Sequence, residues 1–123
     1  MLQAAFWLLS IAVAAGVVIG LRHLRPGGAA GPRWRLGGLA HGIVGIAGLA
    51  ALIIVLRGPL RGAAMGVTGF GPAAAWTIAL AAGLGLVILM LRRGGQAFAA
   101  VVPVHALMAI TGYVVFLAWW ALG

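Results

Sequence analysis

Two histidines, His41 and His105, lie inside long apolar stretches, and each is followed by the same pattern of small residues. Both segments fit H-x3-[GA]-x2-G. Positions i, i+4 and i+7 share one face of a helix, so each imidazole would stand beside two small residues. An ionisable residue within a membrane span is costly, which makes it a candidate functional residue. The small residues of the two motifs are Gly45, Gly48, Ala109 and Gly112.

A neutral imidazole is a good ligand for iron, and axial histidines hold haem in many proteins. Cofactor sites in helical bundles are built from side chains on facing helices. A flat haem b also needs space beside each ligand, which small residues supply. The pattern therefore predicts a haem b with His41 and His105 as its metal ligands. The residues predicted to make room for it are Gly45, Gly48, Ala109 and Gly112.

Arginines lie close to both histidine motifs, and haem propionates need cations. Counted at 1.5 Å per helical residue, His41 lies roughly 9 Å from Arg35, and His105 lies roughly 13 Å from Gln96. Both histidines therefore belong to the same leaflet, next to one arginine-rich interface. The arginines predicted to contact the cofactor are Arg33, Arg35 and Arg93.

Other interpretations of the two motifs stay open. Polar side chains form hydrogen bonds between membrane helices, and stripes of Gly and Ala are a common packing surface. The same residues therefore also fit tight helix packing without a cofactor, a proton relay or another ligand. Tyr113, which follows the second motif, is expected to pack in the core.

The composition is that of a membrane protein. Of the 123 residues, 65% are hydrophobic, and the net charge of +8 comes from arginine alone, with no Asp, Glu or Cys. A soluble domain carries about 25% charged residues. The missing carboxylates exclude paired-acid hydrolysis and carboxylate metal sites, and the missing cysteines exclude disulfides and thiolate chemistry. We expect contacts with membrane lipid and no binding of nucleic acid.

Four apolar stretches are each long enough to cross a hydrocarbon core, which takes about 20 helical residues. Only helices or closed barrels satisfy the backbone in lipid, and no strand-like alternation is present. The sequence therefore predicts an all-α bundle of four transmembrane helices, forming one integral membrane domain over residues 1–123. The predicted spans are residues 3–21, 36–56, 73–91 and 97–122.

The placement of the arginines predicts the orientation. Six lie between the first and second spans or between the third and fourth, whereas only Arg57 and Arg61 lie between the second and third. Cytoplasmic loops carry the excess of basic residues, so both termini are predicted outside. The tryptophans expected at the outer interface are Trp7, Trp76, Trp119 and Trp120.

The two halves of the chain resemble each other. With an offset of 69 the first span matches the third and pairs Ala12 with Ala81; with an offset of 64 the second matches the fourth and pairs His41 with His105. A tandem duplication of a helix hairpin would explain this, with a near-two-fold axis along the membrane normal. Chance matches among abundant small residues are the alternative. Further matched pairs are Gly16 with Gly85 and Gly48 with Gly112.

With four spans and histidine motifs at His41 and His105, the chain resembles the small four-helix membrane b-type cytochromes. These include cytochrome b561-like proteins and the haem-carrying anchor subunits of membrane oxidoreductases. The resemblance implies electron transfer between a partner oxidoreductase and quinone. Many such cytochromes carry two haems and four intramembrane histidines, whereas this chain has two such histidines, which limits it to one haem unless His23 takes part.

The expected function is therefore a non-catalytic electron-transfer subunit that works with other membrane or peripheral redox subunits. The alternative is a cofactor-free accessory or assembly subunit of a larger membrane complex. A small anion transporter or channel is a third interpretation, although no arginine lies within a span. The Ala, Gly and Arg content favours a bacterial inner (plasma) membrane.

Overall fold

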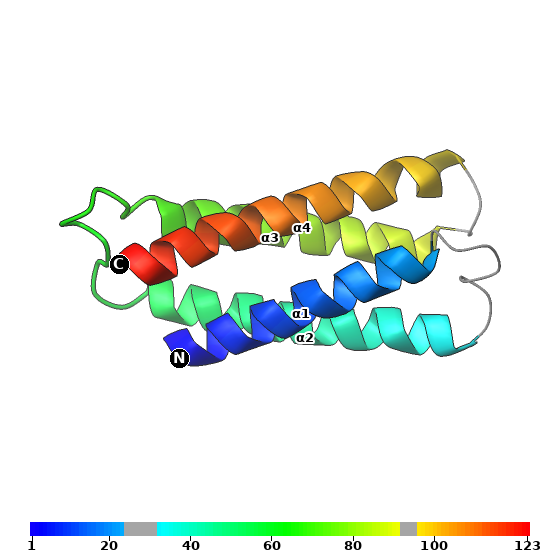
Figure 1. Cartoon of the computed structure of the whole chain (residues 1–123), viewed down its shortest axis with the longest axis horizontal. Coiled ribbons are helices and arrows are strands. Elements are labelled where there is room, and N and C mark those ends of the chain that lie inside the picture. Colours follow the sequence, from blue (N-terminus) through cyan, green and yellow to red (C-terminus); the bar gives the residue numbers. More distant parts are fainter. Residues whose placement is uncertain (24–31, 92–95) are drawn as a thin grey trace.

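The computed structural model describes residues 1–23, 32–91 and 96–123, including all side chains except those of residues 32–34. The described residues form four helices and no strand (Figure 1). Each helix is long and apolar enough to cross a membrane. The predicted all-α fold with four spans is therefore confirmed. The helices are α1 (Leu2–His23), α2 (Pro32–Leu56), α3 (Phe70–Met90) and α4 (Gln96–Leu122).

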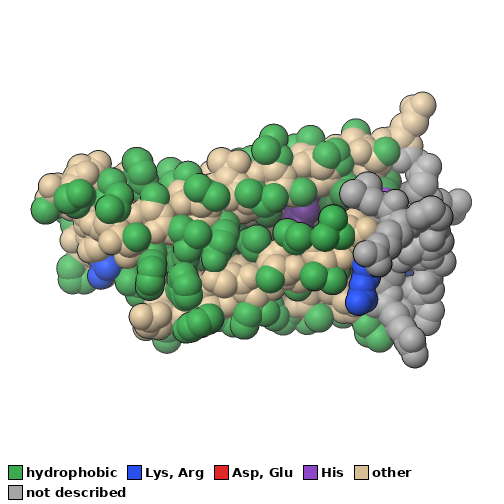
Figure 2. Space-filling model, viewed as in Figure 1, with side chains coloured by type: hydrophobic (Ala, Val, Ile, Leu, Met, Phe, Trp, Pro, Cys, Tyr) green, Lys and Arg blue, Asp and Glu red, His purple; other side chains and the backbone are tan. Residues whose placement is uncertain are grey.

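Apolar side chains cover the face of the bundle seen in Figure 2, and the visible arginine side chains lie at its two ends. Trp76 is 73% exposed and Leu107 is 67% exposed, although both are large and apolar. Helices that expose large apolar side chains on their outer faces fit membrane spans, because lipid covers such a surface favourably.

The helix boundaries differ from the predicted spans by at most four residues, and the largest difference is at α2, which begins at Pro32 rather than at residue 36. Helix α3 begins at Phe70 rather than at residue 73, so Gly71 and Pro72 belong to its first turn. Proline is tolerated there because the first N–H groups of a helix have no partner within it. Pro103, in contrast, lies inside α4, and the helix continues past it.

The bundle consists of two hairpins, with α1 packed on α2 and α3 packed on α4. A Cβ atom on Gly48 would lie 2.9 Å from the Leu9 side chain, and one on Gly112 would lie 2.8 Å from the Ile78 side chain. Leu9 and Ile78 are matched by the offset of 69 found in the sequence. The two hairpins therefore make equivalent close contacts between their helices.

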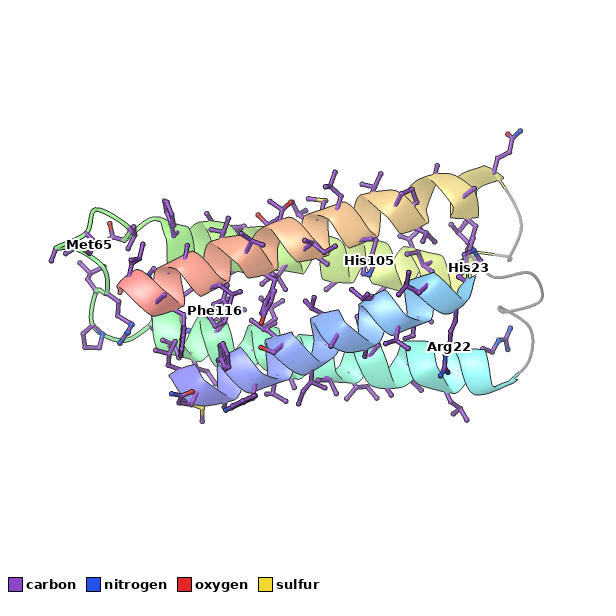
Figure 3. The ribbon with its side chains drawn as sticks, viewed as in Figure 1. Arg22, His23, Met65, His105 and Phe116 are labelled. Carbon is purple, nitrogen blue, oxygen red and sulfur yellow. The ribbon has the colours of Figure 1, made fainter. Side chains whose placement is uncertain are left out.

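The core joins the hairpins at the end of the bundle that holds both termini and the 57–69 connection (Figure 1). Phe116 is fully buried there (Figure 3). Trp119, expected at the lipid interface, is instead only 2% exposed, because its indole fits against Gly71. The buried core residues are Ala5, Leu9, Ala51, Leu52, Val67, Ala74, Ala75, Ile78, Phe116 and Trp119.

Candidate functional site

His41 and His105 make equivalent hydrogen bonds within their own hairpins. Nδ1 of His41 lies 2.9 Å from the carbonyl oxygen of Ala12, and Nδ1 of His105 lies 2.8 Å from that of Ala81. Helix α1 therefore orients the imidazole on α2, and α3 orients the imidazole on α4. Ala12 and Ala81 are also matched by the offset of 69, so the near-two-fold repeat extends to these bonds.

These bonds determine which ring nitrogen of each histidine is available to a ligand. A carbonyl oxygen only accepts hydrogen bonds, so Nδ1 must carry the proton that it donates. In the neutral imidazole, Nε2 then holds the free lone pair. Both histidines are thus in the tautomer that binds a metal through Nε2, and the carbonyl partner makes that nitrogen more basic.

The two imidazoles come from different hairpins and meet between them. Their ring centroids lie 6.1 Å apart, and their planes stand at 85° to each other. A metal ion that binds one nitrogen of each ring at about 2 Å sets the ring centres about 6 Å apart. Both histidines are half-buried (Figure 3 shows His105). The observed separation therefore fits a group held between the two rings.

Two cavities border the histidine pair. The larger, which we call the arginine-end cavity, has a volume of ≈ 520 Å³ and also reaches His23, Arg35 and Phe98. The smaller, the mid-bundle cavity, has a volume of ≈ 330 Å³ and reaches Tyr113 near the core. Ligand pockets in proteins span about 300–1,000 Å³. The imidazoles therefore stand between two spaces of ligand size, and a groove between α1 and α4 exposes a histidine in Figure 2.

Gly16 and Gly85 are site residues that the sequence interpretation did not single out. A Cβ atom on Gly16 would lie 3.0 Å from Cε1 of His41, and one on Gly85 would lie 3.3 Å from Cε1 of His105. Each glycine thus makes room for the imidazole of the neighbouring helix. Their match in the repeat was visible in the sequence, but not the faces on which they lie.

The four small residues of the histidine motifs separate into two groups. Gly45 and Ala109 line the mid-bundle cavity, next to the imidazoles. Gly48 and Gly112 line neither cavity. The space they leave is filled within each hairpin by the side chains of Leu9 and Ile78. In both copies of the motif, the first small residue therefore lines the mid-bundle cavity, and the second makes a close contact between helices.

Of the arginines predicted near the site, Arg35 lines the arginine-end cavity and is exposed. Arg93 and the side chain of Arg33 lie outside the described residues. His23 also lines this cavity. The mostly apolar lining of the arginine-end cavity therefore includes a cation, Arg35, and a third imidazole, His23.

Within the described part of the chain, no group of three or more His, Cys, Asp or Glu side chains could hold a metal ion. A metal at this site would therefore take two protein side chains and complete its coordination from another source. Comparisons with protein-family models, curated proteins and solved structures find no match to this chain. The interpretation of the site rests on its geometry.

Proposed function

We propose that this protein is a membrane cytochrome b subunit that holds one haem b between His41 and His105. The observation that carries the proposal is the matched imidazole pair. The ring centroids of two imidazoles from different hairpins lie 6.1 Å apart, and each Nδ1 is bonded to a backbone carbonyl. Each ring therefore keeps Nε2 free, and neutral histidine nitrogens of this kind are the ligands that haem iron takes.

The surroundings of the pair favour a macrocycle over a bare metal ion. Two imidazoles alone do not complete the coordination of iron, and a porphyrin supplies the other ligands. The cavities on the two sides of the pair leave room for a flat apolar plate, with Gly16 and Gly85 nearby. Arg35 lines the arginine-end cavity, where it can neutralise a propionate.

The side chains of this protein would hold, orient and shield the group. His41 and His105 would bind it through Nε2, while the carbonyls of Ala12 and Ala81 keep the rings in position. The apolar walls exclude water, which raises the cost of charge changes at the site. Haem, when bound, supplies one-electron exchange. The chain offers no carboxylate or thiol for bond-making of its own.

A single haem needs an electron donor and an electron acceptor. We propose a partner oxidoreductase on one side and quinone on the other, in a bacterial inner membrane with both termini outside. The net charge of +8, without any acidic side chain, favours docking against an acidic partner surface.

A reduced-minus-oxidised visible spectrum of the purified protein tests the proposal. We expect the absorption of a low-spin b haem in the wild type and its complete loss in His41→Ala and in His105→Ala. Gly83→Ala is the control, because a Cβ atom there would meet nothing within 4 Å and Gly83 lines neither cavity, so the haem should stay in place. A flat spectrum from folded wild-type protein would refute the cytochrome.

The second candidate is a cofactor-free accessory subunit of a larger complex. The observation that favours it is the close packing at Gly48 and Gly112, which shows small residues of the motif at work in helix contacts. In that case the imidazoles act only through their bonds to Ala12 and Ala81. Folded protein without haem, copurifying with other membrane subunits, is the expected result.

A further inference from the structure

One polar contact joins the two hairpins in the middle of the bundle. The Ser10 hydroxyl donates to the carbonyl oxygen of Phe6 at 2.7 Å, within α1. The Tyr113 hydroxyl, on α4, lies 2.6 Å from the Ser10 oxygen. Because the one proton of Ser10 is directed at a carbonyl, Tyr113 is the donor to Ser10. The phenol is therefore held in a defined position.

This contact breaks the near-two-fold repeat. The offset of 64 pairs Tyr113 with Leu49, and the offset of 69 pairs Ser10 with Ala79. The equivalent place between α2 and α3 thus has a leucine and an alanine, both partly buried. The imidazoles, their carbonyl partners and the glycines beside them are the same residue types in both halves, whereas Ser10 and Tyr113 are not.

The residue that breaks the repeat, Tyr113, also borders the candidate site. Tyr113 lines the mid-bundle cavity together with His41 and His105. Apart from these two histidines, it is the one polar side chain among the described residues that border this cavity. A group held between the imidazoles would therefore meet different surroundings on its two sides at this depth.

We propose that Tyr113, held by Ser10, selects one of two orientations of the haem. This inference rests on the proposed function. The propionates of haem b are related by a half-turn about an axis in the ring plane, but its methyl and vinyl groups are not. A two-fold symmetric site cannot distinguish the two orientations, so selection must come from residues that break the repeat, as Tyr113 does beside the ligands.

The test is the proton NMR spectrum of the oxidised holoprotein, recorded once the signals no longer change with time. In the wild type we expect one dominant set of shifted haem methyl signals. The double variant Ser10→Ala/Tyr113→Leu makes these positions match Ala79 and Leu49. It should bring the ratio of major to minor haem orientation about fivefold closer to one, which corresponds to a loss of about 1 kcal/mol in the free-energy difference between the two orientations. Tyr113→Phe, which keeps the ring and removes only the hydroxyl, should change the ratio in the same direction.

Two equal sets in the wild type, or an unchanged ratio in both variants, would overturn the inference while leaving the cytochrome intact. Protein without any haem absorption would overturn both. Thr77→Val is the control, since the Thr77 hydroxyl bonds within its own helix to Ala73 at 2.8 Å. It should keep the wild-type ratio, and a change as large as that of the double variant would count against a specific role of Tyr113.

Discussion

At His41 and His105 a backbone carbonyl decides which imidazole nitrogen is free. Each ring donates a hydrogen bond from Nδ1 to a backbone carbonyl of the other helix in its own hairpin, which leaves Nε2 on the other side of the ring free. Such an arrangement holds each imidazole in one tautomer and one orientation. The same chemistry appears twice, on residues that the repeat pairs.

The glycines beside the imidazoles give a test at the scale of single residues. In Gly85→Ala the new methyl group would lie 3.3 Å from Cε1 of His105, so the ring must shift against its bond to Ala81. Overpacking of this kind costs about 1 kcal/mol or more. We expect haem binding to weaken about fivefold, measured by haem titration of the apoprotein. Gly16→Ala, at the paired position, should act in the same way.

Gly83→Ala is the matched control on the same helix. A Cβ atom there meets nothing within 4 Å, and Gly83 lines neither cavity. Alanine also favours the helix by about 1 kcal/mol over glycine, so this variant should bind haem normally and be at least as stable. Equal haem affinity in Gly83→Ala and Gly85→Ala would contradict the role given to Gly85.

At this scale the sequence predicts the imidazoles but not their surroundings. His41 and His105 are conspicuous because ionisable residues in apolar spans are rare. Their partners are the main-chain oxygens of Ala12 and Ala81, and a main-chain acceptor leaves no signature in residue type. Tyr113 packs against the core as expected, but its bond to a different hairpin depends on how the hairpins meet.

At the scale of helices, the four long apolar stretches were sufficient to predict the fold. A backbone in lipid must satisfy its own hydrogen bonds, so each stretch is expected to form a helix. The start of α3 was placed too late because Gly71-Pro72 resembles a turn, although proline is acceptable in a first helical turn. Trp119 was assigned to the interface because its burial depends on a glycine in another helix, Gly71.

Gly48 and Gly112 allow a test of the hairpins. A Cβ atom on Gly48 would lie 3.1 Å from the backbone nitrogen of Leu9, and one on Gly112 would lie 3.1 Å from that of Ile78. A backbone cannot move aside as a side chain does, so helices must separate. We expect Gly48→Ala and Gly112→Ala each to destabilise the protein by about 1–3 kcal/mol, measured by unfolding in detergent.

The two variants should have similar effects because the contacts are equivalent in the repeat. Gly42→Ala, on the same helix as Gly48, serves as the control, since its Cβ would meet nothing within 4 Å. Its stability should equal or exceed that of the wild type. Wild-type stability in both Gly48→Ala and Gly112→Ala would rule out close packing at these positions.

At the scale of the whole molecule, the two ends differ. The core joins the hairpins near the termini, while the arginine-end cavity lies beyond the imidazoles. Arginine placement predicts that this second end faces the cytoplasm. Because the chain lacks cysteine, single-cysteine variants report the orientation without background.

Labelling of intact cells with a membrane-impermeant maleimide provides the measurement. Ala64→Cys, in the exposed connection between α2 and α3, should react from outside. Gln96→Cys, at the exposed start of α4, should react only after the membrane is opened. Wild-type protein should not react at all. The opposite pattern would place the termini in the cytoplasm.

The bonds from Ala12 to His41 and from Ala81 to His105 also bear on how the protein is assembled. Membrane helices first insert and then associate. Each hairpin contains both an imidazole and the carbonyl that orients it, so a packed hairpin already carries an aligned imidazole. The association of the two hairpins then sets the distance between the two rings. The histidine pair would thus form when two hairpins, each with its imidazole already oriented, dock against each other.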